Sequence, residues 1–269
     1  MKKIYSSIDI GSDTIKFVVG EYFNNKINIL SSYIIKSKGV RKGLIVDANL
    51  TINAIKDGIK QVNRMLGFEI KKVIVNVPSY NANFMYVTGS IDINNEDDII
   101  TTEDVNKVIK ASVYNKLPVD YELVNLVPIE FILDNEEKTM LPVGKSSKKV
   151  DLKAIMISSP KKQVIDVIEV IEKSGLQVVD IVLSGLADYY EVKNKNTEDK
   201  LGAIINLGHE TTNVSIINNG VLTNTDVIKL GGINVEKDIA YVFGVSIFDA
   251  RTIKEKFASS NKRFCSISE

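Results

Sequence analysis

The sequence predicts an α/β protein with two lobes, in which the first lobe is split by an inserted α+β unit. Strands alternate with amphipathic helices on both sides of residues 81–151, where this pattern changes. A strand–turn–strand motif close to the start of the chain also recurs after residue 204. The 269 residues correspond to about two domains of roughly 150 residues each, so both lobes have enough chain to form a core.

The first lobe begins with a predicted strand pair, Ile4–Ile10 and Ile15–Glu21. Ala48–Leu66 carries apolar residues at helical spacing, and Gly67 follows as a C-terminal cap. The apolar segment KKVIVNVP then returns as a buried strand. A strand pair, a crossover helix and a further strand are the beginning of a mixed α/β sheet.

The inserted unit is expected to contain a strand in FMYVTGSIDI, a helix over Thr102–Leu117 and strands in ELVNLVPIEFIL. Thr101 and Asp104 have the spacing of a capping box at the start of that helix. The first lobe then resumes with the strand KAIMISSP, a helix over Lys161–Lys173 and the strand QVVDIVL.

A polar cluster, NKNTEDK, follows a helical stretch, Ser184–Lys193, and precedes the apolar run LGAIINL. Such a cluster is typical of a linker between lobes. The expected division is 1–80 and 152–193 for the split first lobe, 81–151 for the inserted unit, 194–200 for the linker and 201–269 for the second lobe.

The composition excludes several classes of function. Lys and Arg number 34, and Asp and Glu also number 34, so no basic excess is available to neutralise a nucleic-acid backbone. The single Cys265 cannot form an internal disulfide, and the first residues lack the apolar region of a secretory signal. No apolar run approaches the 18 or so residues of a spanning helix. We therefore expect a cytoplasmic protein that does not bind nucleic acid.

An internal repeat places IDIGSDTIKFVV over INLGHETTNVSI. Identical or conservative pairs occur along both copies: Ile8 with Ile205, Asp9 with Asn206, Gly11 with Gly208, Asp13 with Glu210 and Thr14 with Thr211. Each copy is expected to be a hairpin with a tight turn at Gly. Two interpretations are open: unrelated hairpins that share a turn glycine, or homologous lobes whose turns face each other and bind an anion through backbone N–H groups.

The second interpretation places a nucleotide phosphate chain between the turns. Asp9 ends the first strand, where its carboxylate can hold a hydrated Mg²⁺ against the phosphates. Thr14 and Lys16 share a face of the next strand, so the Lys16 cation can reach the phosphates. The alternative for Lys16 is an ordinary solvated strand residue.

Three segments, DIGSDTIK, INLGHETTNV and KLGGINVEKDIA, resemble the phosphate-binding hairpins and the following segment of the actin, Hsp70 and sugar-kinase superfamily. Within it, the chain from Ile4 to about Phe257 is similar to the FtsA family of bacterial cell-division proteins. That similarity rests on ordered blocks: SKGVRKGLIVDANLTINAIKDGI, ITTEDVNKVIKAS, VPIEFILD, LPVGKSSKKVDLKAIMIS and KSGLQVVDIVLSGLADYY.

The resemblance implies an actin-like, ribonuclease H-like α/β fold of two lobes, with 81–151 as the inserted subdomain. It also implies ATP and Mg²⁺ as ligands, FtsZ as a partner and self-association through the inserted subdomain. The family links the FtsZ ring to the cytoplasmic face of the cell membrane at the division site. The nucleotide-binding residues that it implies are Asp9, Gly11, Ser12, Asp13, Thr14, Lys16, Asn206, Gly208, His209, Glu210, Thr211, Gly231, Gly232 and Lys254, with Asp9 also at the metal.

The sequence departs from the family pattern around the expected second phosphate hairpin. The family has Asp where Asn206 stands, so we expect negligible ATPase activity and no catalytic residue. Glu210 brings a carboxylate to a place where phosphates are expected, and His209 is expected at the cleft mouth. Arg251 replaces a family Glu three residues before Lys254, which puts ribose recognition in doubt.

The resemblance also implies that the second lobe continues beyond Glu269 and ends in an amphipathic membrane helix. Because this sequence contains neither, a fragment and a naturally short protein are both open. We expect monomers or short oligomers, and membrane attachment only through the absent helix. The alternative functions are a sugar kinase or polyphosphatase of the same superfamily, or an ATP-binding type IV pilus assembly protein.

Overall fold

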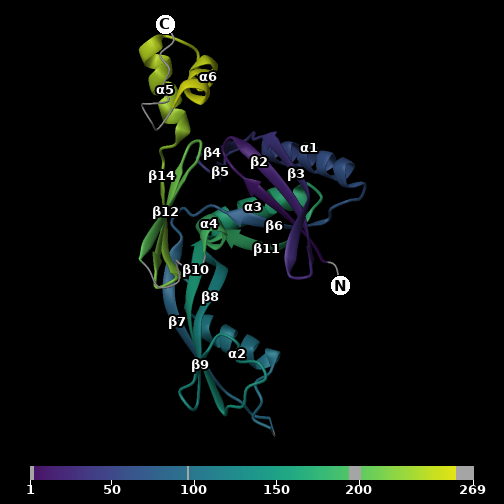
Figure 1. Ribbon diagram of the computed structural model, residues 1–269, viewed down its shortest axis with the longest axis vertical. Helices are drawn as coiled ribbons and strands as arrows, with labels where there is room; N and C mark the ends of the chain where they lie inside the picture. The colour runs from purple at the N-terminus through teal and green to yellow at the C-terminus, as the bar shows by residue number, and fades with distance from the viewer. Residues whose placement is uncertain (1–2, 96, 194–200, 259–269) are drawn as a thin grey trace.

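The structure is a computed structural model that describes residues 3–95, 97–193 and 201–258 (Figure 1). The expected linker, 194–200, and Cys265 lie outside these residues. The described chain forms three main sheets. The inserted sheet with its helix extends to one end of the molecule, and the last two helices lie at the other end (Figure 1).

The first sheet has five strands in the order β11-β6-β1-β2-β3. Its strands are β1 (Lys3–Ile10), β2 (Thr14–Phe23), β3 (Lys26–Lys36), β6 (Lys72–Val77) and β11 (Gln177–Leu183). β1, β2 and β3 form an antiparallel meander, whereas β6 runs parallel to β1 and β11 runs parallel to β6. The sheet is therefore mixed, as the sequence predicts. A short hairpin of β4 (Val40–Arg41) and β5 (Leu44–Ile45) follows β3.

Two helices, α1 (Ala48–Leu66) and α3 (Lys161–Lys173), pack against the first sheet. The bounds predicted for both helices are confirmed. The Asp47 side chain accepts a hydrogen bond from the N–H of Leu50 at the start of α1, and Gly67 ends the helix in the left-handed region with φ 77°. Inward-facing residues of the sheet, among them Ile15 and Phe17, are almost fully buried against this layer.

The inserted unit is a four-stranded sheet in the order β7-β10-β8-β9, with α2 (Thr102–Val113) packed on it. The strands are β7 (Asn83–Asp92), β8 (Tyr121–Leu133), β9 (Lys138–Thr139) and β10 (Lys149–Pro160). The predicted capping box of α2 is present. The predicted end of this helix at Leu117 is wrong, because Tyr114 leaves the helical region and Asn115 has a left-handed φ of 53°.

β10 corrects one part of the expected division. The first lobe was expected to resume at residue 152, but β10 runs unbroken through residues 151 and 152 and pairs with β7 and β8. All twelve of its residues belong to the inserted sheet. A strand whose side chains are buried on both faces has no alternation to show which sheet it joins, so its sequence did not separate these alternatives.

The third sheet consists of β12 (Gly202–Leu207), β13 (Thr212–Asn218) and β14 (Val221–Ile228), all antiparallel. α4 (Ser184–Val192) contacts all three strands, and α5 (Gly232–Phe243) and α6 (Ile247–Phe257) pack against each other beyond them. One apolar cluster contains residues of all three sheets, including Leu183, Ile155 and Leu222. Among the described helices, none is both long and apolar enough to cross a membrane.

Candidate functional site

A cavity of about 470 Å³ lies where the β1–β2 and β12–β13 turns approach each other. The expected residues that line it are Asp9, Gly11, Ser12, Asp13, Thr14, Lys16, Asn206, Gly208, His209 and Thr211. Its lining also includes residues of β6 and α4. The chain therefore brings the two copies of the internal repeat to one cleft.

The two turns have the same backbone geometry. The N–H of Gly11 donates to the carbonyl of Thr14 at 3.1 Å, and the N–H of Gly208 donates to that of Thr211 at 2.8 Å. A Cβ at either glycine would lie within 2.9 Å of the same carbonyl oxygen. Both turns thus require glycine for the same steric reason, which supports the interpretation that the hairpins are equivalent.

In the first hairpin, Asp9 and Lys16 are direct cross-strand neighbours. The Lys16 ammonium lies 2.9 Å from the Asp9 carboxylate, and both side chains are about half exposed. The Ser12 hydroxyl accepts a hydrogen bond from the N–H of Gly43 at 2.7 Å, which ties the turn to the β4–β5 hairpin. A carboxylate and an ammonium group therefore lie together beside this turn, at the cavity.

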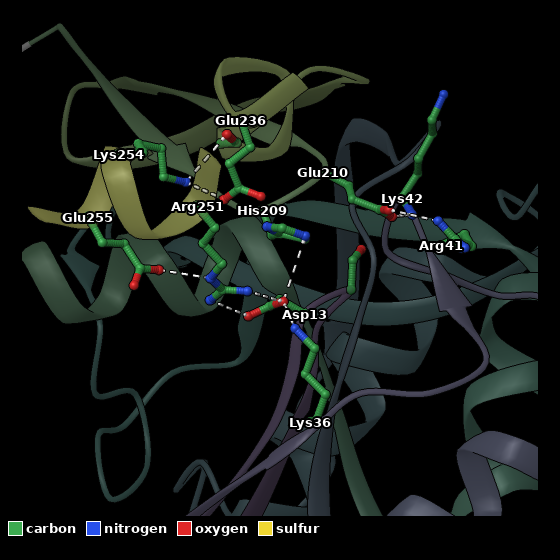
Figure 2. A network of polar contacts seen from close by, with 12 residues as sticks. Asp13, Lys36, Arg41, Lys42, His209, Glu210, Glu236, Arg251, Lys254 and Glu255 are labelled. Carbon is green, nitrogen blue, oxygen red and sulfur yellow. Dashed lines mark hydrogen bonds and ion pairs between the residues drawn. The ribbon is translucent and has the colours of Figure 1, made fainter. Parts of the chain in front are cut away.

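Asp13 connects the tip of the first hairpin to α6 (Figure 2). The Arg251 guanidinium donates to both carboxylate oxygens, at 3.1 and 3.2 Å, and the ammonium of Lys36 donates to the same carboxylate. His209 Nε2 lies 3.7 Å from it. Burial opposes ionisation, but the hydrogen bonds from Arg251 and Lys36 outweigh it and lower the pKa of Asp13 to about 2. Asp13 is therefore a fixed anion that joins the first sheet to α6.

Glu210, the repeat equivalent of Asp13, connects the tip of the second hairpin to the β4–β5 hairpin of the first lobe (Figure 2). Its carboxylate accepts a hydrogen bond from the backbone N–H of Lys42 and lies 3.5 Å from the Arg41 guanidinium. Burial, together with the negative charge of Glu210, raises the pKa of Tyr80. Each hairpin therefore carries one carboxylate that pairs with groups from the opposite lobe.

Asn206 is the next-to-last residue of β12, and its side chain contacts α4. Its amide nitrogen donates to both carboxylate oxygens of Asp188, at 3.1 and 2.9 Å. Asn76 lines the same cavity, where its side chain accepts from the N–H of Ile10 at 3.0 Å and donates to the Ser184 hydroxyl at 2.9 Å. These side chains form a polar floor between β1, β6 and the start of α4.

Glu210, Gly231, Gly232 and Lys254 are not among the residues that line the cavity. The N–H of Gly232 donates to the carbonyl of Gly208 at 2.9 Å, so the start of α5 is hydrogen-bonded to the second turn. The Lys254 ammonium lies 2.5 Å from the buried carboxylate of Glu236. This partly buried ion pair holds α6 to α5.

Sequence reasoning missed several polar residues that line the cleft: Asn76, Ser184, Asp188 and Asn213. Asn76 interrupts the apolar strand KKVIVNVP, and a polar side chain within a buried strand is a signal that could have been used. Asp188 lies in the middle of a short helix and carries no local signal. Only the packing of α4 against β12 brings its carboxylate to the cleft.

The donor set of the cleft suits a magnesium nucleotide better than a protein-enclosed metal. No group of three His, Cys, Asp or Glu side chains in the described residues is arranged to hold an ion. Mg²⁺ typically keeps several waters and binds through one or two carboxylates together with phosphate oxygens. The accessible Asp9 carboxylate, beside a turn of backbone N–H groups, fits that chemistry.

Two family descriptions match the chain: "SHS2 domain inserted in FTSA" over residues 81–158 and "Cell division protein FtsA" over residues 203–266. The cell division protein FtsA of Bacillus subtilis (strain 168) is 30% identical over 254 residues, which cover 94% of this chain and 58% of that protein. The chain belongs to the FtsA family. It spans little more than half the length of this FtsA relative.

Solved structures place this FtsA-family chain among actin-like folds. The structure titled "PilM-PilN type IV pilus biogenesis complex" matches with a TM-score of 0.62 and 14% identity, covering 94% of this chain and 69% of that one. The ethanolamine utilization protein EutJ from Carboxydothermus hydrogenoformans matches with a TM-score of 0.55 and 16% identity, covering 95% and 62%. At these identities the likeness concerns the fold alone. The predicted actin-like α/β fold with an inserted subdomain is confirmed.

Proposed function

We propose that this chain is the nucleotide-binding part of an FtsA-type cell-division protein and that it binds ATP with Mg²⁺ between its two hairpins. The observation that carries the proposal is that two equivalent glycine turns, far apart in the sequence, line a single cavity of about 470 Å³. Such turns present backbone N–H groups to an anion from two sides. Membership of the FtsA family supports the same conclusion.

Each group near the turns has a role in this proposal. Lys16 supplies a cation for the phosphates, and Asp9 supplies an oxygen ligand for Mg²⁺ or for its waters. Mg²⁺, when bound, neutralises phosphate charge. Asn206 is neutral and the Glu210 carboxylate does not line the cavity, so the second hairpin offers no anionic partner for an attacking water. We therefore propose that the nucleotide is a structural ligand and that turnover is negligible.

Calorimetric titration of the purified chain with ATP and Mg²⁺ tests this proposal. We expect Asp9→Ala to weaken binding by at least about tenfold, because the variant removes the metal-facing oxygen. Asp57→Ala is the matched control, since Asp57 is exposed on α1, away from the cleft lining. Equal affinity of the wild type and Asp9→Ala would exclude this cleft as the site.

We further propose that the protein links FtsZ to the cytoplasmic membrane at the division site and self-associates through the inserted sheet. Pull-downs that offer FtsZ and a type IV pilus assembly protein as alternative baits distinguish this proposal from a pilus function. Capture by the pilus protein alone would overturn it. Sedimentation with and without nucleotide tests self-association, for which we expect monomers or short oligomers of this chain.

A further inference from the structure

Asn206, near the end of β12, binds the carboxylate of Asp188 on α4. Asn206 Nδ2 lies 2.9 and 3.1 Å from the two carboxylate oxygens of Asp188. Asp188 lies on α4, is half-buried and lines the cleft together with Asp9 and Lys16. The contact therefore fixes the position of the Asp188 carboxylate at the cleft.

The partner of Asp188 differs in charge from the partners of Asp9 and Asp13, two other carboxylates that line the cleft. Asp9 pairs with the Lys16 ammonium, and Asp13 pairs with Arg251 and Lys36. The Asn206 amide is neutral, so this hydrogen bond orients the Asp188 carboxylate without compensating its charge. A polyphosphate that enters the cleft meets this negative charge, and like charges in a partly desolvated site repel unless a cation lies between them.

We propose that Asp188 is the second carboxylate for the divalent cation of the bound nucleotide, and that Asn206 serves to position it. The assignment rests on the proposed nucleotide function. Asp9 would face the cation from the first hairpin, and Asp188 would face it from α4, directly or through one of the waters that Mg²⁺ retains. Asp188 would thus supply a carboxylate beside the second hairpin, although that hairpin itself carries the neutral Asn206.

This assignment also predicts the effect of Asn206→Asp. The variant would place two carboxylates about 3 Å apart, where both cannot remain ionised without a cost. We therefore expect Asn206→Asp to weaken ATP binding instead of repairing the site. The exchange of both residues, Asp188→Asn with Asn206→Asp, keeps one amide and one carboxylate in contact.

The test measures the ATP dissociation constant by calorimetry, once with Mg²⁺ and once with a chelator, and compares the ratio of the two values. We expect Asp188→Asn to reduce the strengthening of binding by Mg²⁺ by about tenfold or more. A residue that only held α4 in place would change both constants equally and leave the ratio unchanged. Glu191→Gln is the matched control, because Glu191 is exposed at the cleft on the same helix, and we expect its ratio to stay at the wild-type value.

The outcomes separate this assignment from the function on which it rests. A reduced ratio in Asp188→Asn and its recovery in the exchanged double variant would support the assignment. An unchanged ratio in Asp188→Asn, or an equal reduction in Glu191→Gln, would overturn it and leave ATP binding in the cleft intact. A wild-type chain that binds no ATP in either condition would overturn both proposals.

Discussion

The two hairpins that line the cleft have the same turn geometry, but the side chains beside their turns differ in charge. Both close with the same glycine-to-threonine hydrogen bond. In the first hairpin the cross-strand pair beside the turn is Asp9 with Lys16, whereas the equivalent pair in the second is Asn206 with Asn213. The two copies of the repeat therefore share the geometry of the turn, and the charged groups beside the two turns are distributed unequally.

The tips of the hairpins differ in what they contact. Asp13 receives a bidentate hydrogen bond from Arg251, and Glu210 receives one backbone N–H and the longer contact to Arg41. These two connections cross between the lobes in opposite directions. The ion pairs at the hairpin tips therefore join the lobes in addition to the apolar cluster shared by the three sheets, and the bidentate Asp13 connection is the stronger of the two.

The largest effect is expected from Gly231→Ala, which separates the second hairpin from α5. A Cβ at Gly231 would lie 2.6 Å from the His209 carbonyl and 2.7 Å from that of Gly208. We expect a loss of about 1–3 kcal/mol in the free energy of unfolding, measured by urea denaturation. Gly202→Ala is the control, because a Cβ there meets nothing within 4 Å. A stable Gly231→Ala variant would show that the second turn does not need this support.

The next effect concerns Asp13→Asn. The variant removes the anion that Arg251 and Lys36 share, and we expect a loss of about 1–2 kcal/mol at neutral pH after solvent screening. The pKa of Asp13 is lowered from 3.8 to about 2 in the folded chain. Ionised Asp13 therefore stabilises the fold above about pH 4, and this contribution is lost as the pH falls to about 2.

Urea denaturation of the wild type and Asp13→Asn at several pH values between about 2 and 5 measures this dependence. We expect the difference between the two proteins to shrink steadily toward acid. A difference that stays constant over this range would mean that the carboxylate charge does not contribute.

A smaller effect is expected from Glu210→Gln. The amide oxygen can still accept from the N–H of Lys42, so the variant loses only the attraction to Arg41, whose side chain is 75% exposed. We expect a change of about 0.5 kcal/mol or less in the free energy of unfolding. An effect as large as that of Asp13→Asn would contradict the inequality of the two connections.

The smallest effect on stability is expected from Lys16→Gln. Lys16 and Asp9 are about half exposed, and such surface pairs contribute roughly 0–1 kcal/mol. ATP affinity should nevertheless fall, because the first hairpin loses its cation. Thermal unfolding and calorimetry on the same samples separate the two effects. Unchanged affinity would favour the interpretation of Lys16 as a solvated strand residue.

Elements with a strong local pattern could be predicted from the sequence. The bounds of α1 and β11 agree with the prediction because their apolar spacing and flanking residues are local signals. The sequence did not reveal that β10 joins the inserted sheet, because its burial on both faces removes the alternation. It also placed the end of α2 too late, since the turn after Val113 depends on a left-handed Asn115.

The two turns of the candidate site could be predicted from the sequence, but the ion pairs and hydrogen bonds of its side chains could not. The repeat identified both turns because glycine is required at each of them. Nothing in the sequence near Asp13 indicates Arg251, and nothing near Asn206 indicates Asp188, because helix packing alone brings these groups together. The sequence likewise does not indicate that the ammonium of Lys254, which was expected near the nucleotide, binds the carboxylate of Glu236 on α5.

The bond between Asp13 and Arg251 joins residues 238 positions apart in the chain. A contact between residues so far apart in the sequence closes a very long loop, which costs conformational entropy. The ion pair offsets this cost only when both residues already lie on folded elements. We therefore expect it to form after the rate-limiting step of folding. Substitution of Arg251 should then accelerate unfolding and leave the folding rate nearly unchanged, so this bond lengthens the time for which α6 stays attached to the first hairpin.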